Sequence, residues 1–145
     1  MLTTTNSTAA ARAVPGIGQV RARALCAAGG ALAAALAWAV EAPLLGIHLN
    51  FRFGTGHIQT IAAGQVIGVT VAAALLGWLL LAVLERRTPR ARRLWTTIAL
   101  AALAASLALP LIAATTTAAT AALIVMHLTV GATVIPAMAR TARRR

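Results

Sequence analysis

His127 is the residue of this sequence that is best suited to do chemistry. It lies nine residues after Ala118, where the last apolar segment starts. At about 1.5 Å per helical residue this is a depth of ~14 Å, near the middle of a bilayer core of ~30 Å. Thr120 and Gly131 fall on the same helical face as His127. Because an imidazole that faces lipid is costly, we expect this face to point into a helix bundle.

Two roles for His127 fit this position. In the first, His127 carries a proton, contacts a ligand or acts as an axial haem ligand. In the second, a neutral His127 joins two helices through a hydrogen bond with a threonine or a backbone carbonyl. The second role needs no ligand and is the simpler prediction.

A second group of polar residues lies in and beside the stretch 43–57: Glu41, His48, Arg52 and His57. An ion pair between Glu41 and Arg52 would fix this stretch to the end of the preceding helix. Two imidazoles and a carboxylate are also ligands for a divalent metal. The histidines, however, lie nine residues apart and lack the i, i+4 spacing of a helical metal site. We therefore expect a polar loop here, with a metal site as the weaker alternative.

The second apolar segment contains a Gly-x-x-x-Gly pair, Gly64 and Gly68, with Ala72 on the same stripe. Small residues at this spacing allow two membrane helices to approach closely, and Gly30 offers a similar surface in the first segment. Gln65 borders the stripe, and we expect it to hydrogen-bond to a neighbouring helix, with a substrate contact as the alternative. The stripes predict helix contacts within one bundle or, less simply, between two copies in a homodimer.

The composition indicates an integral membrane protein. Hydrophobic residues make up 60% of the chain and charged residues only 10%, whereas a soluble domain has about 25% charged residues. The net charge of +11 comes from arginines that stand between apolar segments, and aromatic residues are scarce, so we expect no binding to nucleic acid. No GxSxG, P-loop, HExxH or CxxC motif occurs, and a single cysteine excludes an internal disulfide. We therefore expect neither an enzyme nor a bound cofactor.

The apolar segments predict an all-α fold, an integral membrane four-helix bundle. A helix needs ~20 residues to cross the bilayer, and its backbone must be hydrogen-bonded internally there. Residues 1–20 are expected to form a flexible tail, and residues 21–145 the transmembrane domain. Pro110 predicts a kink in the third helix. The expected spans are 24–42, 58–84, 94–114 and 118–138.

The arginines predict the orientation of this bundle. Of the 13 arginines, only Arg52 falls in the first or third connection between the predicted spans. The positive-inside rule then places both termini in the cytoplasm and the chain in the inner (plasma) membrane. The arginines of the second connection and of the C-terminus are also expected to attract anionic lipids.

Several segments of the chain together resemble a family of short four-span membrane proteins from high-GC Gram-positive bacteria. The resemblance is carried by residues 46–52 (GIHLNFR), 79–87 (LLLAVLERR) and 90–96 (RARRLWT), and by the stretch from Met126 to Pro136. It implies the four-helix membrane fold. Because the function of that family is unassigned, it implies no mechanism.

Three functions remain open at this point. The first is a non-enzymatic scaffold or accessory subunit, which the small-residue stripes and the nearly uncharged interior favour. The second is a small proton-linked transporter or channel, a monomer or a dimer, that uses His127 with Gln65 or Glu41. The third is a haem- or quinone-binding subunit, which needs a second axial ligand from a homodimer or from a methionine such as Met126 or Met138.

Overall fold

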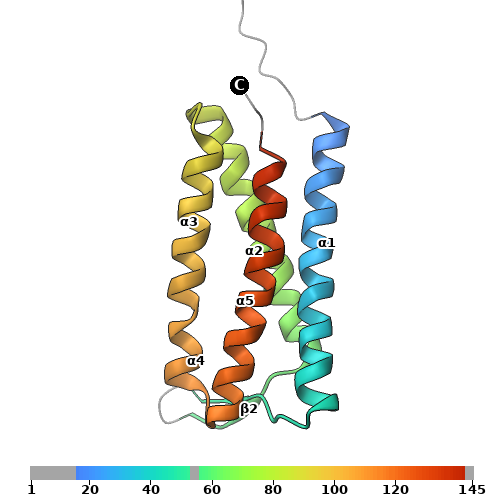
Figure 1. Ribbon diagram of the computed structural model, residues 1–145, viewed down its shortest axis with the longest axis vertical. Helices are drawn as coiled ribbons and strands as arrows, with labels where there is room; N and C mark the ends of the chain where they lie inside the picture. Colours follow the sequence, from blue (N-terminus) through green and yellow to red (C-terminus); the bar gives the residue numbers. More distant parts are fainter. Residues whose placement is uncertain (1–15, 53–55, 143–145) are drawn as a thin grey trace, which may run out of the picture.

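The computed structural model describes residues 16–52 and 56–142, and nearly all of them are helical (Figure 1). The helices are α1 (Ile17–Ala39), η1 (Val40–Leu44), α2 (Ala63–Arg87), α3 (Ala91–Ser106), α4 (Ala108–Ala113) and α5 (Thr117–Arg140). Two short strands, β1 (Asn50–Phe51) and β2 (Gln59–Thr60), pair antiparallel in the loop between η1 and α2. The predicted all-α fold is confirmed.

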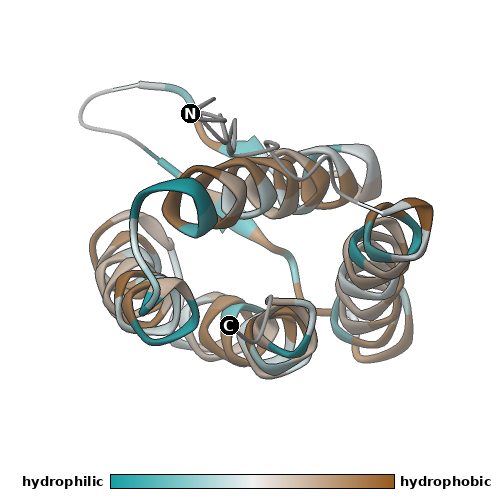
Figure 2. Ribbon diagram, turned by 90° about the horizontal axis from the view of Figure 1, so that it is seen from above, coloured by the Kyte–Doolittle hydropathy of each residue, from teal (hydrophilic) through white to brown (hydrophobic). Residues whose placement is uncertain are grey.

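Four helical stretches are long and apolar enough to cross a membrane: Ile17–Leu44, Ala63–Arg87, Ala91–Ala113 and Thr117–Arg140. Large hydrophobic side chains, among them Leu25, Leu76 and Ile112, remain exposed on the outside of the bundle. Brown, hydrophobic ribbon accordingly appears on all sides of the helices in Figure 2. Since such a surface is unfavourable in water, these features indicate a multi-pass membrane protein.

The first span is longer than the sequence predicts at both ends. Its first turn starts at Ile17, in the stretch assigned to the flexible tail, and the remainder of that tail up to residue 15 lies outside the described residues. At its other end, Pro43 has no N–H with which to continue the α-helical pattern. The chain instead makes one wider π-helical turn, η1, in which the Leu45 N–H donates to the Val40 carbonyl at 2.9 Å.

Gly46 ends this extended helix. Its φ of +64° is a left-handed conformation that glycine adopts without strain. The reversal brings the Ile47 N–H back to the Glu41 carbonyl at 3.0 Å. The helix therefore continues past Glu41 and stops at a glycine, as helices commonly do.

The third span is interrupted where Pro110 predicts a kink. Pro110 cannot donate a hydrogen bond to the Ser106 carbonyl four residues earlier. Helix α3 accordingly ends at Ser106, and α4 begins at Ala108 after a turn at Leu107. The expected kink is confirmed.

The four spans form a bundle in which α1 and α3 each pack against α2 and α5 (Figures 1 and 2). The start of α1, the α2–α3 turn and the end of α5 lie together at one end, which we name the terminal end (Figure 1). The opposite end, which we name the hairpin end, contains η1, the β1–β2 pair and the connection from α4 to α5.

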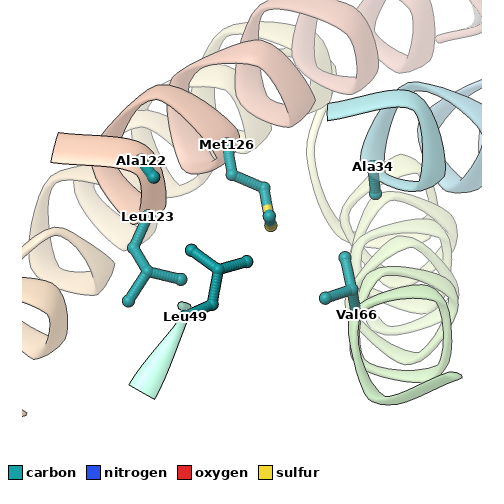
Figure 3. Packing of buried hydrophobic residues seen from close by; sticks show 6 residues of the cluster. All are labelled: Ala34, Leu49, Val66, Ala122, Leu123 and Met126. Atoms are coloured by element: carbon teal, nitrogen blue, oxygen red, sulfur yellow. The ribbon is translucent and has the colours of Figure 1, made fainter. Parts of the chain in front are cut away.

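At the hairpin end, a loop residue fills the bundle core. Leu49 is 1% exposed and packs with residues of α1, α2 and α5. In Figure 3 it points toward Leu123 and Met126, with Val66 and Ala34 on the opposite side. The loop that contains β1 is thereby fixed beneath the helices, and the Arg52 N–H extends this attachment to the Ala113 carbonyl at 2.8 Å.

At the terminal end, a buried ion pair joins three spans. The Arg23 Nη2 lies 2.6 Å from the Glu85 Oε1, and Arg23 is only 1% exposed. The Arg23 Nε–H donates to the Thr141 hydroxyl at 3.2 Å, and the Gln19 amide donates to the Thr141 carbonyl at 3.0 Å. These hydrogen bonds, of which those of Arg23 are charge-assisted, connect α1 to the end of α2 and to the residue that follows α5.

Removal of one partner of this ion pair is expected to destabilise the bundle strongly. The Glu85→Ala substitution leaves the Arg23 guanidinium buried without its anion, and we expect the free energy of unfolding to fall by about 3–5 kcal/mol. Replacement of both residues by methionine is expected to restore most of the loss, because no uncompensated charge remains. Reversible unfolding in detergent micelles measures both effects.

The matched control is Arg92→Ala, which removes an exposed arginine from the first turn of α3. We expect it to change the free energy of unfolding by no more than about 0.5 kcal/mol. Equal effects of Glu85→Ala and Arg92→Ala would show that the ion pair does not hold the helices together.

Candidate functional site

His127 and Thr120, the two polar residues on one face of α5, each form a hydrogen bond to a carbonyl one turn earlier in the chain. His127 is half-buried, and its Nδ1–H donates to the Leu123 carbonyl at 2.6 Å, one turn earlier in the same helix. The Thr120 hydroxyl donates in the same way to the Thr116 carbonyl at 3.0 Å. Within the described residues, His127 does not make the hydrogen bond to a second helix that the sequence suggests.

Gln65 also bonds within its own helix. Its Oε1 accepts from the Ala62 N–H at 3.0 Å, and the side chain is exposed. The sequence-based expectation of an interhelical hydrogen bond is corrected here, and the physical reason is the position at which α2 begins. Because α2 starts at Ala63 and not near Ile58, Gln65 falls in the first turn, where free backbone N–H groups take up side-chain acceptors.

Glu41 does not form the ion pair with Arg52 that the sequence suggests. Arg52 is exposed, and its backbone is tied to the Ala113 carbonyl. His48 and His57 are exposed as well, whereas Glu41 is buried. In residues 16–52 and 56–142 no three histidine, cysteine or acidic side chains come close enough to hold a metal ion.

The Glu41 side chain is only 5% exposed, and both of its carboxyl oxygens lack a hydrogen-bond partner in the part of the chain that the structure describes. This is unusual, because most buried polar side-chain atoms have a partner. An uncompensated carboxylate in apolar surroundings costs several kcal/mol. Glu41 is therefore the residue whose surroundings call for a ligand, a proton or another partner.

Glu41 lies on a groove of about 650 Å³ between α1 and α5. The groove is almost entirely apolar, and besides Glu41 only Thr129 contributes a polar side chain. Its walls come from the second half of α1, from η1 and the residues after it, and from the first half of α5. The residues that line it are Ala33, Leu36, Ala37, Val40, Glu41, Leu45, Ile47, Ala118, Ala121, Ala122, Val125 and Thr129.

The sequence contains a pattern that indicates this groove, but the predicted end of the first helix near Glu41 hid its meaning. Ala33, Ala37 and Glu41 recur every four residues and so share one face of α1. A helix that ends at Glu41 exposes that side chain at the rim. Because η1 adds a further turn, Glu41 becomes an inward position of a continuous helix.

Gly30 and Gly131 are packed closely against neighbouring side chains, whereas Gly64 and Gly68 are not. A Cβ atom added at Gly30 would clash with Val134, and one added at Gly131 would come within 2.6 Å of Leu103. Both glycines are thus used for close contacts inside the bundle. Gly64 and Gly68 are exposed, and a Cβ atom at either would meet nothing within 4 Å.

Residues 15–144 match the family model of a family of unknown function (DUF6069). No similar curated protein and no similar solved structure was found.

The local hydrogen bond of His127 predicts a mild effect when this residue is replaced. We expect His127→Ala to lower the free energy of unfolding by about 1 kcal/mol or less, because one intrahelical bond is lost. Native mass spectrometry of protein released gently from its own membrane is expected to show the same bound molecules in the variant and the wild type. Thr133→Ala is the control, since the Thr133 hydroxyl makes the same type of bond to the Thr129 carbonyl. A molecule lost only from the His127 variant would instead identify His127 as a ligand site.

Proposed function

Since this chain belongs to DUF6069, a family of unknown function, we propose a function for it from the exposed surfaces of its own helix bundle. The chain acts as a non-enzymatic scaffold or accessory subunit in the plasma membrane. It associates side by side with another transmembrane helix through the glycine surface of α2, which consists of Gly64, Gly68 and Ala72. The helix that packs against this surface can be α2 of a second copy or a helix of another membrane protein.

The exposure of this glycine surface carries the proposal. All three residues face away from the bundle, and neither glycine has a neighbour that a side chain would displace. Glycine within a helix costs about 0.5–1 kcal/mol relative to alanine. At Gly30 and Gly131 that cost is offset by close packing against another helix of the same chain. At Gly64 and Gly68 the corresponding gain would come from a helix outside the chain.

The physics of association in lipid supports this assignment. Lipid tails are as apolar as leucine, so helices gain little by burying ordinary hydrophobic side chains against each other. A Gly-x-x-x-Gly surface lets two backbones come close enough for extensive van der Waals contact. Contacts through the exposed leucines on the outside of this bundle would gain little free energy in lipid. Contacts through the glycine surface gain more, because the backbones can come close.

The distribution of charge supports a cytoplasmic terminal end. Among the described residues, the arginines gather there, at the start of α1, in the α2–α3 turn and at the end of α5, with Arg52 as the exception at the hairpin end. The positive-inside rule then favours cytoplasmic termini. A shallow depression of about 510 Å³ beside Arg90, Arg92 and Arg93 suits anionic lipid headgroups, which would fix the depth of the bundle.

Proton-linked transport through His127 draws less support from the same residues. Such a pathway needs His127 near Gln65 or Glu41, yet the hydrogen bonds of His127 and Gln65 stay within α5 and α2. The haem- or quinone-binding role likewise gains no second ligand from Met126, which packs in the apolar cluster around Leu49.

The glycine surface can be blocked without disturbing the fold. In a Gly64→Leu/Gly68→Leu variant the new Cβ atoms have no other described residue within 4 Å, both positions are exposed, and leucine favours the helix. We expect association to weaken at least about tenfold, because the backbones can no longer approach. Energy transfer between labelled copies in liposomes measures self-association. Cross-linking in native membranes with quantitative mass spectrometry measures a heteromeric partner.

Gly29→Leu is the matched control, because Gly29 also has free space around it but lies on α1 outside the glycine surface. It should associate as the wild type does. If the double variant matches the wild type in both assays, the proposed role of α2 is refuted.

A further inference from the structure

We propose that the groove between α1 and α5 binds a lipophilic amine in its cationic form. The Glu41 side chain, whose carboxyl oxygens are buried, turns into the groove so that its carboxylate pairs with the ammonium group, and the apolar part of the ligand lies along the two helices. This site is separate from the glycine surface of α2 and does not depend on the scaffold role.

Glu41 is a buried acid whose carboxyl group lacks a partner in the described part of the chain. The residue is only 5% exposed, and neither carboxyl oxygen has a hydrogen-bond partner within residues 16–52 and 56–142. The contrast with Glu85 is direct, because Glu85 meets the Arg23 guanidinium at 2.6 Å. A buried carboxylate is stable when a cation faces it and its lone pairs accept hydrogen bonds. An ammonium group supplies a positive charge and up to three donors at once.

The shape of the groove suits a ligand with an elongated apolar body. Along α1 and η1 it extends from Ala33 to Glu41, which at 1.5 Å per residue is ~12 Å. Its volume of about 650 Å³ lies within the range of ~300–1,000 Å³ that is typical of small-molecule sites. Alanines form much of its floor on both helices, and this is what leaves room for a ligand. Glu41 stands at one end of this apolar channel, as expected for a ligand with a charged head and an apolar body.

The groove is accessible from the lipid. Leu36, Val40 and Val125 line the groove and are also exposed on the outside of the bundle. The groove is therefore open along its side, where the described surface of the bundle is apolar. A ligand that dissolves in the bilayer reaches it laterally, without passing through the packed core around Leu49.

The charge of the groove selects the ligand. Its lining contains one acidic side chain and no basic one. A phospholipid with an amine headgroup would bring its phosphate close to Glu41, where no cation of the lining would balance it. A ligand with a single positive charge and no anionic group matches the lining, and for this reason we favour an amine over a membrane phospholipid.

The test uses a photoactivatable derivative of dodecylamine with full-length protein in phosphatidylcholine nanodiscs, and mass spectrometry locates the labelled residues. We expect labelling of α1 and α5 along the groove, and competition by dodecylamine at least tenfold more effective than by dodecanol. Glu41→Gln keeps the size of the side chain and removes its charge, and we expect it to weaken labelling about tenfold or more.

A second variant keeps the proposal testable if Glu41→Gln alters folding. Ala121→Leu fills the groove and retains the carboxylate, and it should also abolish labelling. Ala132→Leu, at an exposed position of α5 outside the groove, is the control and should be labelled like the wild type. Circular dichroism and thermal unfolding establish that each variant is folded.

Three results would overturn the proposal. They are full labelling of folded Glu41→Gln, equal competition by dodecanol and dodecylamine, and better competition by phosphatidylethanolamine than by dodecylamine. The first two would leave a purely apolar groove, and the third would assign it to lipid. None of them affects the role of α2, because energy transfer between labelled copies reports on the glycine surface alone.

Discussion

The absence of water around the helices is the constraint on which the rest of the structure depends. In a bilayer, each polar group needs a partner within the protein. Threonine and histidine side chains meet this need by bonding to carbonyls of their own helices, as Thr70 and His127 do. Arg23 and Glu85 meet it by pairing across helices. Within the described chain, the Arg23 Nη1 and both carboxyl oxygens of Glu41 are buried without a hydrogen-bond partner. Glu41 differs from Arg23 in that no atom of its charged group is paired with a described residue.

The same constraint explains why glycine and alanine matter more here than large hydrophobic residues. When lipid surrounds a helix, burial of leucine against leucine gains little, and closeness of backbones decides which helices pair. Gly30 and Gly131 provide that closeness inside the bundle. Gly64 and Gly68 would allow the same close approach of backbones on the outside of the bundle. One physical rule thus links the internal packing of the chain to the surface through which we propose that it associates.

The sequence predicted four apolar helical spans and the disturbance of the third one at Pro110, because apolar length and proline chemistry are local properties. It did not predict that Gln65 would cap its own helix, since this depends on where α2 starts. It also placed Glu41 at the rim, because the wider turn around Pro43 and the stop at Gly46 depend on several residues acting together. The groove itself joins residues of α1 and α5 that are far apart along the chain, and no local pattern reveals such a pairing.

The two ends of α1 show how one helix combines structural and binding roles. Near its start, Arg23 is held by Glu85 and Thr141, so that both charge and hydrogen bonds are largely used within the chain. Just beyond its end, in η1, Glu41 borders a groove whose lining is apolar except for Thr129, and no described residue donates a hydrogen bond to its carboxyl group. The paired end fixes α1 against α2 and α5, and the Leu49 loop fixes the hairpin end from below. Contacts at both ends of α1 thus fix the spacing between the two helices that form the groove beside Glu41, which lowers the cost of ordering when a ligand binds.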